Sequence, residues 1–160
     1  MRGVILAVLV IFAGVIGLPA GAADFDKGCE AFDRGDFERA MEEWEPLAEQ
    51  GHPAAQFRLG CLYAFGQGVE QDYAQALELY RESAAQGDAD AQNNLGSMYA
   101  LGWGAEVDLV EAYMWLELAA RSGHEMATRN RSFLAERMTG DEIGEAVARA
   151  DRFAAARATN

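Results

Sequence analysis

Histidine and cysteine are the residue types of this chain best suited to act as bases, nucleophiles or metal ligands, and there are two of each. His124 begins a His-Glu pair like that of zinc proteases, but position 128 is Thr, so the second zinc ligand of that motif is missing. Lys27 is the only lysine, and no Gly-x-Ser-x-Gly, Ser-x-x-Lys or Cys-x-x-Cys motif occurs. We therefore expect a protein that is not an enzyme and has no metal site and no cofactor.

The two cysteines occupy matching positions, each directly after a glycine, at Gly28-Cys29 and Gly60-Cys61. In an oxidising compartment, two cysteines suggest a disulfide. A disulfide requires Cα atoms about 4.4–6.8 Å apart, whereas equivalent positions on packed helices lie about 8–10 Å apart. The sequence leaves three states open: a Cys29–Cys61 bridge, two free thiols, or pairing with another chain.

The N-terminus has the pattern of an export signal. Arg2 is followed by an uncharged apolar run over Val4–Leu18 and by small residues at Ala20 and Ala22. We expect a cleaved signal peptide over 1–22, a mature chain in the periplasm or outside the cell, and no membrane insertion after cleavage. The alternative is an uncleaved N-terminal membrane anchor, because about 20 apolar residues can span a bilayer.

The length and charge of the chain limit its partners. The 160 residues suffice for one domain. Acidic side chains outnumber basic ones 26 to 13, giving a net charge of −13. This charge disfavours binding to the phosphates of nucleic acids and to anionic membrane surfaces. It favours a protein or peptide partner that is basic.

An internal repeat organises most of the chain. Residues 52–87 align with residues 88–123 without a gap, and the same offset places Asp36 on Asp72 and Gly51 on Gly87. The repeat-defining residues are Gly60, Tyr63, Gly66, Gly68 and Ala76 in one copy and Gly96, Tyr99, Gly102, Gly104 and Ala112 in the next. A fixed period of this length indicates stacked supersecondary units.

Each unit is predicted to form two helices. Apolar residues have helical spacing over Pro53–Phe65, and the Gly-x-Gly segment at Gly66–Gly68 then ends that helix. Asp72 is placed to cap a second helix, which Gly87 ends. The pattern predicts an all-α protein, an α-solenoid of antiparallel helix pairs with about four helical hairpins including the terminal caps.

The C-terminal segment follows the same plan less faithfully. A helix is expected over Met126–Arg137. The spacing of Thr139 and Glu142 then matches a capping box before a helix over Ile143–Arg157. This last pair would cap the end of the array.

The repeat resembles the Sel1-like repeat family, a branch of the tetratricopeptide superfamily. The resemblance rests on the motif Ala55-x3-Leu59-Gly60-x2-Tyr63-x2-Gly66-x-Gly68-Val69-x2-Asp72-x3-Ala76, which recurs between Ala91 and Gly123. It implies a tetratricopeptide-like repeat at 24–51, Sel1-like repeats at 52–87 and 88–123, and a degenerate capping helix pair at 124–160.

The resemblance also implies where a partner would bind, since tetratricopeptide arrays line their inner face with the first helix of each pair. By helical phase, this face carries Phe25, Cys29, Phe32, Phe57, Cys61, Phe65, Asn93, Ser97 and Leu101. The functional interpretation is a groove for an extended or helical peptide. The alternative is that the aromatic residues pack between repeats. Trp103, in the exposed turn, is either a second contact or a loop anchor.

Three functional classes remain. The resemblance implies an exported protein–protein interaction scaffold or adaptor in the cell envelope, with a possible regulatory role. A secreted factor that acts on another cell is the second class. The third, a hydrolase of the β-lactam type, is disfavoured because the chain lacks the Ser-x-x-Lys motif and the cysteine pairs of such proteins.

Overall fold

The structure is a computed structural model that describes residues 23–159, and the predicted signal peptide at 1–22 lies outside the described residues. In residues 23–159 the chain forms helices and no strand, which confirms the expected all-α fold. The helices are α1 Phe25–Asp33, α2 Phe37–Glu49, α3 Pro53–Phe65, α4 Tyr73–Ala85, α5 Ala89–Leu101, α6 Leu109–Arg121, α7 Glu125–Ala135 and α8 Gly140–Ala158.

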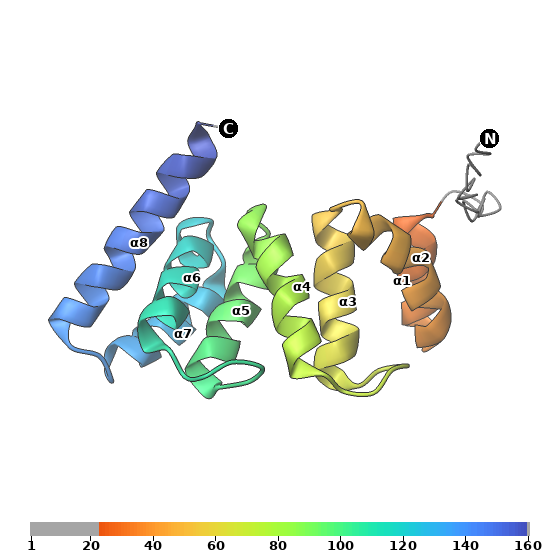
Figure 1. Cartoon of the computed structure of the whole chain (residues 1–160), viewed down its shortest axis with the longest axis horizontal. Coiled ribbons are helices and arrows are strands. Elements are labelled where there is room, and N and C mark those ends of the chain that lie inside the picture. The colour runs from red at the N-terminus through yellow and green to blue at the C-terminus, as the bar shows by residue number, and fades with distance from the viewer. Residues whose placement is uncertain (1–22, 160) are drawn as a thin grey trace, which may run out of the picture.

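The helices stand in a row of antiparallel pairs, from α1 and α2 at one end to α8 at the other (Figure 1). Each helix contacts mainly its neighbours along the chain, while α8 folds back onto α6. Within the described part of the chain, no helix is long and apolar enough to cross a membrane.

Side chains at the N-terminal ends fix where the helices begin. Asp72 accepts hydrogen bonds from the backbone N–H groups of residues 74 and 75, as expected for an N-cap. His52 and His124 are also N-caps. Nδ1 of His52 accepts a hydrogen bond of 3.2 Å from the backbone N–H of Ala55, and Nδ1 of His124 accepts one of 3.0 Å from that of Ala127. Both histidines of the chain therefore stabilise helix starts.

Glycine allows the two helices of each pair to approach closely. A Cβ on Gly60 of α3 would lie 2.7 Å from Cε1 of Tyr80 on α4, and a Cβ on Gly96 of α5 would lie 2.8 Å from Cγ of Leu116 on α6. In the first pair, Gly28 faces Trp44 in the same way. The large side chain of the second helix thus packs directly on the backbone of the first.

The Gly-x-Gly loops fold back onto the preceding pair. Gly66 and Gly102 end α3 and α5 in the left-handed conformation, with φ of 64° and 73°. Gly104 then lies against the backbone of Tyr73, where a Cβ would collide with the Tyr73 carbonyl oxygen. Each loop therefore packs on the start of a helix in the unit before it.

The last helix closes the array. The capping box of Thr139 and Glu142 is formed, and α8 begins at Gly140, three residues before the start expected from periodicity. Phe153 packs edge-on against Trp115 of α6, with ring centroids 5.1 Å apart. Arg121 of α6 pairs with Asp151 at 2.6 Å. The helix α8 therefore covers apolar surface of α6 that no further repeat would cover.

Candidate functional site

Exposed apolar side chains gather on the helices α3, α5 and α7, the first members of their pairs. Phe65 is 67% exposed, and Leu101 and Phe133 are each 56% exposed. Trp103, in the loop after α5, is 44% exposed. Four large apolar side chains open to solvent are a costly arrangement in a protein that has no partner, and such patches mark interaction surfaces.

Two adjoining pockets lie between these side chains, and we call them together the A-helix groove. The first has a volume of about 150 Å³ and is bounded by Phe65, Tyr73 and Trp103. The second has a volume of about 180 Å³ and is bounded by Leu101 and Phe133 among others. Ser97 of α5 lines both pockets, so they adjoin at this residue, one beside α3 and the other beside α7.

The position of Trp103 is set by its neighbours. Its indole stacks on the ring of Tyr73, with centroids 5.0 Å apart and an interplanar angle of 17°. The adjacent Gly104 holds the loop against the α4 start. Trp103 thus anchors its loop and also forms a wall of the groove. Its role as a contact for a partner stays a prediction.

Three of the predicted groove residues line the pockets, namely Phe65, Ser97 and Leu101. The half-buried Phe57 packs on Tyr80 instead, with ring centroids 5.8 Å apart. Near the N-terminus, Phe32 packs against Phe37 and Trp44, and Phe25 stacks on His52 at 5.3 Å. These aromatic residues serve contacts within and between the helix pairs.

Asn93 is 9% exposed and belongs to a polar contact between repeats. Its side-chain amide donates to Asn94, and its side-chain oxygen accepts a hydrogen bond of 3.0 Å from Asn130 of α7. Ser97 donates to the backbone oxygen of Asn93. This network fixes the floor of the groove where α5 meets α7.

Cys29 and Cys61 are not joined by a disulfide in the structure. Cys61 accepts a hydrogen bond of 3.3 Å from the hydroxyl of Tyr80. Burial raises the pKa of both thiols above the ordinary value. Each is therefore protonated and weakly nucleophilic at neutral pH, so neither has the properties of a catalytic cysteine.

Phe133 and Arg137 are groove residues that the sequence interpretation did not include. Phe133 lies one 36-residue period after Ser97, and Arg137 lies one period after Leu101. The same register would have placed both on this face, had the repeat been extended through α7. The Arg137 guanidinium lies 4.3 Å from the centroid of the Phe133 ring, a cation–π contact.

The lining of the groove is apolar and contains no carboxylate. Arg137 is the one charged residue among the groove-lining residues of the described chain. The excess of negative charge therefore lies on other faces of the molecule. The groove suits an apolar segment of a partner, and its chemistry does not itself select for positive charge.

These features define a helical-repeat solenoid with an open apolar face, and the comparisons with known proteins find Sel1 repeats within it. The family model described as Sel1 repeat matches residues 53–88 and 89–124. The chain thus carries two consecutive Sel1 repeats within a larger helical array. The comparison with curated proteins gave no match.

Two solved structures are similar over most of the chain. One is a protective antigen present in uropathogenic Escherichia coli strains and displaying an SLR fold, with 31% identity and a TM-score of 0.75 over 79% of this chain and 28% of that chain. The other is a Sel1 repeat protein from Oxalobacter formigenes, with 32% identity and a TM-score of 0.68 over 81% of this chain and 56% of that chain. The chain spans less than two thirds of either protein. Sel1-repeat folds generally serve as protein–protein interaction scaffolds.

Proposed function

We propose that the protein is an exported, non-catalytic scaffold that binds a protein partner in the cell envelope through the A-helix groove. The main support for this proposal is a row of exposed apolar side chains around two adjoining pockets, namely Phe65, Leu101, Trp103 and Phe133. The pockets are small, so each fits one apolar side chain of a bound segment. An amphipathic helix or an extended strand could present two such side chains at once.

Site-specific photocrosslinking tests the groove. A benzophenone side chain placed at position 133 lies beside the second pocket, whereas the same group at position 85 lies on the exposed end of α4. After exposure to envelope extract of the source organism, we expect one dominant crosslinked partner from position 133 and none from position 85. Leu101→Glu should abolish the crosslink, because a carboxylate would have to be desolvated against the partner's apolar side chain.

The proposal fails if positions 133 and 85 yield the same products, or if Leu101→Glu leaves the crosslink unchanged in a protein of wild-type helicity. The far-ultraviolet circular dichroism of each variant supplies that control. Leu101 is exposed, so its replacement leaves the core intact.

Export is tested separately. We propose that residues 1–22 direct the chain out of the cytoplasm and are then removed, and N-terminal sequencing of the protein recovered from cell fractions measures this directly. A start near Ala23 in the periplasmic fraction supports the envelope role. Recovery from the culture medium supports a secreted factor, and an intact N-terminus in the membrane fraction supports an anchored protein.

A further inference from the structure

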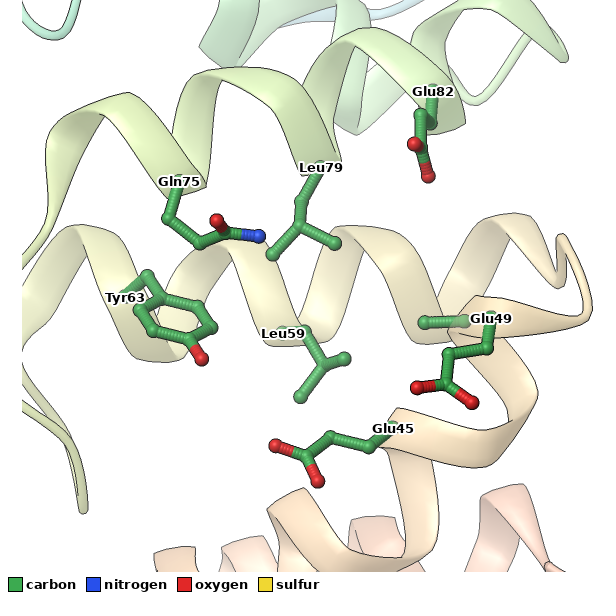
Figure 2. A pocket seen from close by; sticks show the side chains of 8 residues that line it. Glu45, Glu49, Leu59, Tyr63, Gln75, Leu79 and Glu82 are labelled. Atoms are coloured by element: carbon green, nitrogen blue, oxygen red, sulfur yellow. The ribbon is translucent and has the colours of Figure 1, made fainter. Parts of the chain in front are cut away.

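A larger pocket lies on another face of the molecule, between α2 and α4 and above α3. It has a volume of about 390 Å³, with Leu59 and Leu79 as an apolar floor. Figure 2 shows Glu45 and Glu49 extending from α2 and Glu82 from α4 around this floor, with Tyr63 of α3 at one end. We call it the acidic pocket.

The acidic pocket and the A-helix groove use opposite sides of α3. Successive residues of an α-helix are rotated by about 100°, so Cys61 is rotated by ~200° from Leu59. Leu59 and Tyr63 therefore face the acidic pocket, while Cys61 and Phe65 face away from it. A partner could occupy one site without covering the other.

The charged groups of the acidic pocket have no cationic partner within the described chain. Glu45 and Glu49 are exposed and take part in none of the ion pairs between residues 23 and 159. Glu82 accepts a hydrogen bond of 2.7 Å from the amide of Gln56. Three carboxylates around an apolar floor match a side chain with an apolar stem and a cationic head.

The next interface between repeats holds an arginine at the position equivalent to the acidic pocket, and this arginine indicates which cation fits the pocket. At an offset of 36 residues, Tyr63 corresponds to Tyr99 and Glu45 corresponds to Arg81. The Arg81 guanidinium donates a hydrogen bond of 2.7 Å to the hydroxyl of Tyr99. It also pairs with Glu78 at 2.6 Å.

Both partners of this arginine have counterparts one repeat earlier, and one of these, Tyr63, lines the acidic pocket. Glu78 corresponds to Glu42, which lies outside the pocket lining and pairs with Arg39 at 2.7 Å. The Tyr63 hydroxyl makes no hydrogen bond with any described residue. The arginine itself is missing, since its position holds Glu45. A large side chain is missing as well, because Leu79 stands where the next repeat has Trp115.

We propose that the acidic pocket binds an arginine side chain of a protein partner, which takes the place that Arg81 occupies in the following repeat. The guanidinium would donate to the Tyr63 hydroxyl and pair with Glu45, and its aliphatic stem would lie on Leu59 and Leu79. This proposal does not depend on the A-helix groove, because the two sites share no lining residue.

A nuclear magnetic resonance titration tests the proposal with N-acetylarginine methylamide as the probe. Added to isotope-labelled protein up to millimolar concentrations, the probe should shift the backbone amide signals around Glu45, Tyr63 and Glu82. Nα-acetyllysine methylamide, with the same charge, should bind several-fold more weakly, because its ammonium lacks the planar fork of the guanidinium. Equal binding of the two probes would overturn the assignment to arginine.

Substitution of Glu45 supplies the decisive variant. Glu45→Arg gives the pocket its own arginine, as in the next repeat, and should weaken probe binding at least tenfold. Glu106→Arg makes the same charge change at an exposed residue of the loop before α6, outside the pocket lining, and should leave most of the binding in place. If Glu45→Arg and Glu106→Arg bind the probe equally well, the pocket is not its site.

Tyr63→Phe is a second variant that keeps the ring and the fold while removing the hydroxyl. We expect it to weaken the arginine probe about fivefold, the usual effect of one hydrogen bond, and to leave the lysine probe less affected. An unchanged affinity in Tyr63→Phe would contradict the proposed geometry. Failure of either variant leaves the groove proposal untouched, since the crosslinks at position 133 report on a separate face.

Discussion

Tyr80 shapes the environment of the Cys61 thiol. Its hydroxyl donates a hydrogen bond of 3.3 Å to Sγ of Cys61, and its ring packs on the Gly60 backbone. Burial raises the pKa of Cys61, and the hydrogen bond from Tyr80 opposes this rise only in part. Burial also raises the pKa of Tyr80 well above the ordinary value. The pair is therefore neutral over the physiological range of pH.

We predict that Cys61 in the native protein reacts with iodoacetamide with a midpoint above the ordinary thiol pKa of about 8.5. Tyr80→Phe removes the hydrogen bond that favours the thiolate, so the midpoint should rise further. The rate of alkylation at each pH, measured by mass spectrometry of the Cys61 peptide, checks this. Tyr113→Phe, in α6, is the control. A midpoint at or below the ordinary value would contradict the prediction.

The same shift has a consequence for stability. A thiol whose pKa is raised by folding contributes its full stability below the pKa of the unfolded chain, and loses it as the pH rises toward the folded value. The free energy of unfolding should therefore decrease above about pH 8.5.

Single residues divide into those that the sequence could place and those that it could not. Phe65 and Leu101 line the pockets in the direction that helical phase predicts, and their contact with a peptide stays a prediction. Phe57 and Asn93 have the right phase, but Tyr80 and Asn130 cover them. Coverage depends on the size of side chains in neighbouring helices, and the phase of one helix does not contain that information.

At the scale of the helices, the close approach of α3 and α4 rests on Gly60. We predict that Gly60→Ala lowers the free energy of unfolding by about 2 kcal/mol, because the added methyl group would overlap the buried Tyr80 ring. Urea denaturation followed by circular dichroism measures the change.

Gly144 provides a matched control for this prediction. It also lies within a helix, α8, but a Cβ there would meet no atom within 4 Å. Gly144→Ala should therefore stabilise the protein by about 0.5–1 kcal/mol, through the better helix propensity of alanine. If both substitutions had the same sign, the packing explanation for Gly60 would be wrong.

Helix positions were well predicted where glycine and capping residues mark the ends. Pro53–Phe65 was expected and is the observed α3, bounded by His52 and Gly66. At the C-terminal end the repeat is degenerate, so periodicity gave Ile143 as the start of a helix that begins at Gly140. Apolar periodicity begins only where the helix meets its neighbour, and the first turn of α8 is exposed.

At the scale of the whole molecule, the 36-residue period determines the order of helices but not the spaces between them. The acidic pocket exists because Glu45 and Leu79 stand where the next repeat has Arg81 and Trp115. Recognising this from sequence requires knowing which positions meet across the interface, and the structure supplies that knowledge through the Arg81–Tyr99 contact. Differences between repeats therefore create surface features that the shared period does not predict.

The contacts of the array run mainly between neighbouring helices, so its stability should be distributed along its length. We predict that a chain ending at Met138, which lacks α8, loses amide-exchange protection in α5, α6 and α7 by at least tenfold, while α1 and α2 keep most of theirs. The reason is that removal of α8 exposes Trp115 and leaves Arg121 without Asp151. Hydrogen exchange measured by mass spectrometry resolves the segments, and a chain ending at Ala158 is the control. A uniform loss of protection from α1 to α7 would mean that the helix pairs unfold as one cooperative unit, whereas a graded loss would show that α8 stabilises chiefly the repeats it covers, including the floor of the A-helix groove on α5 and α7.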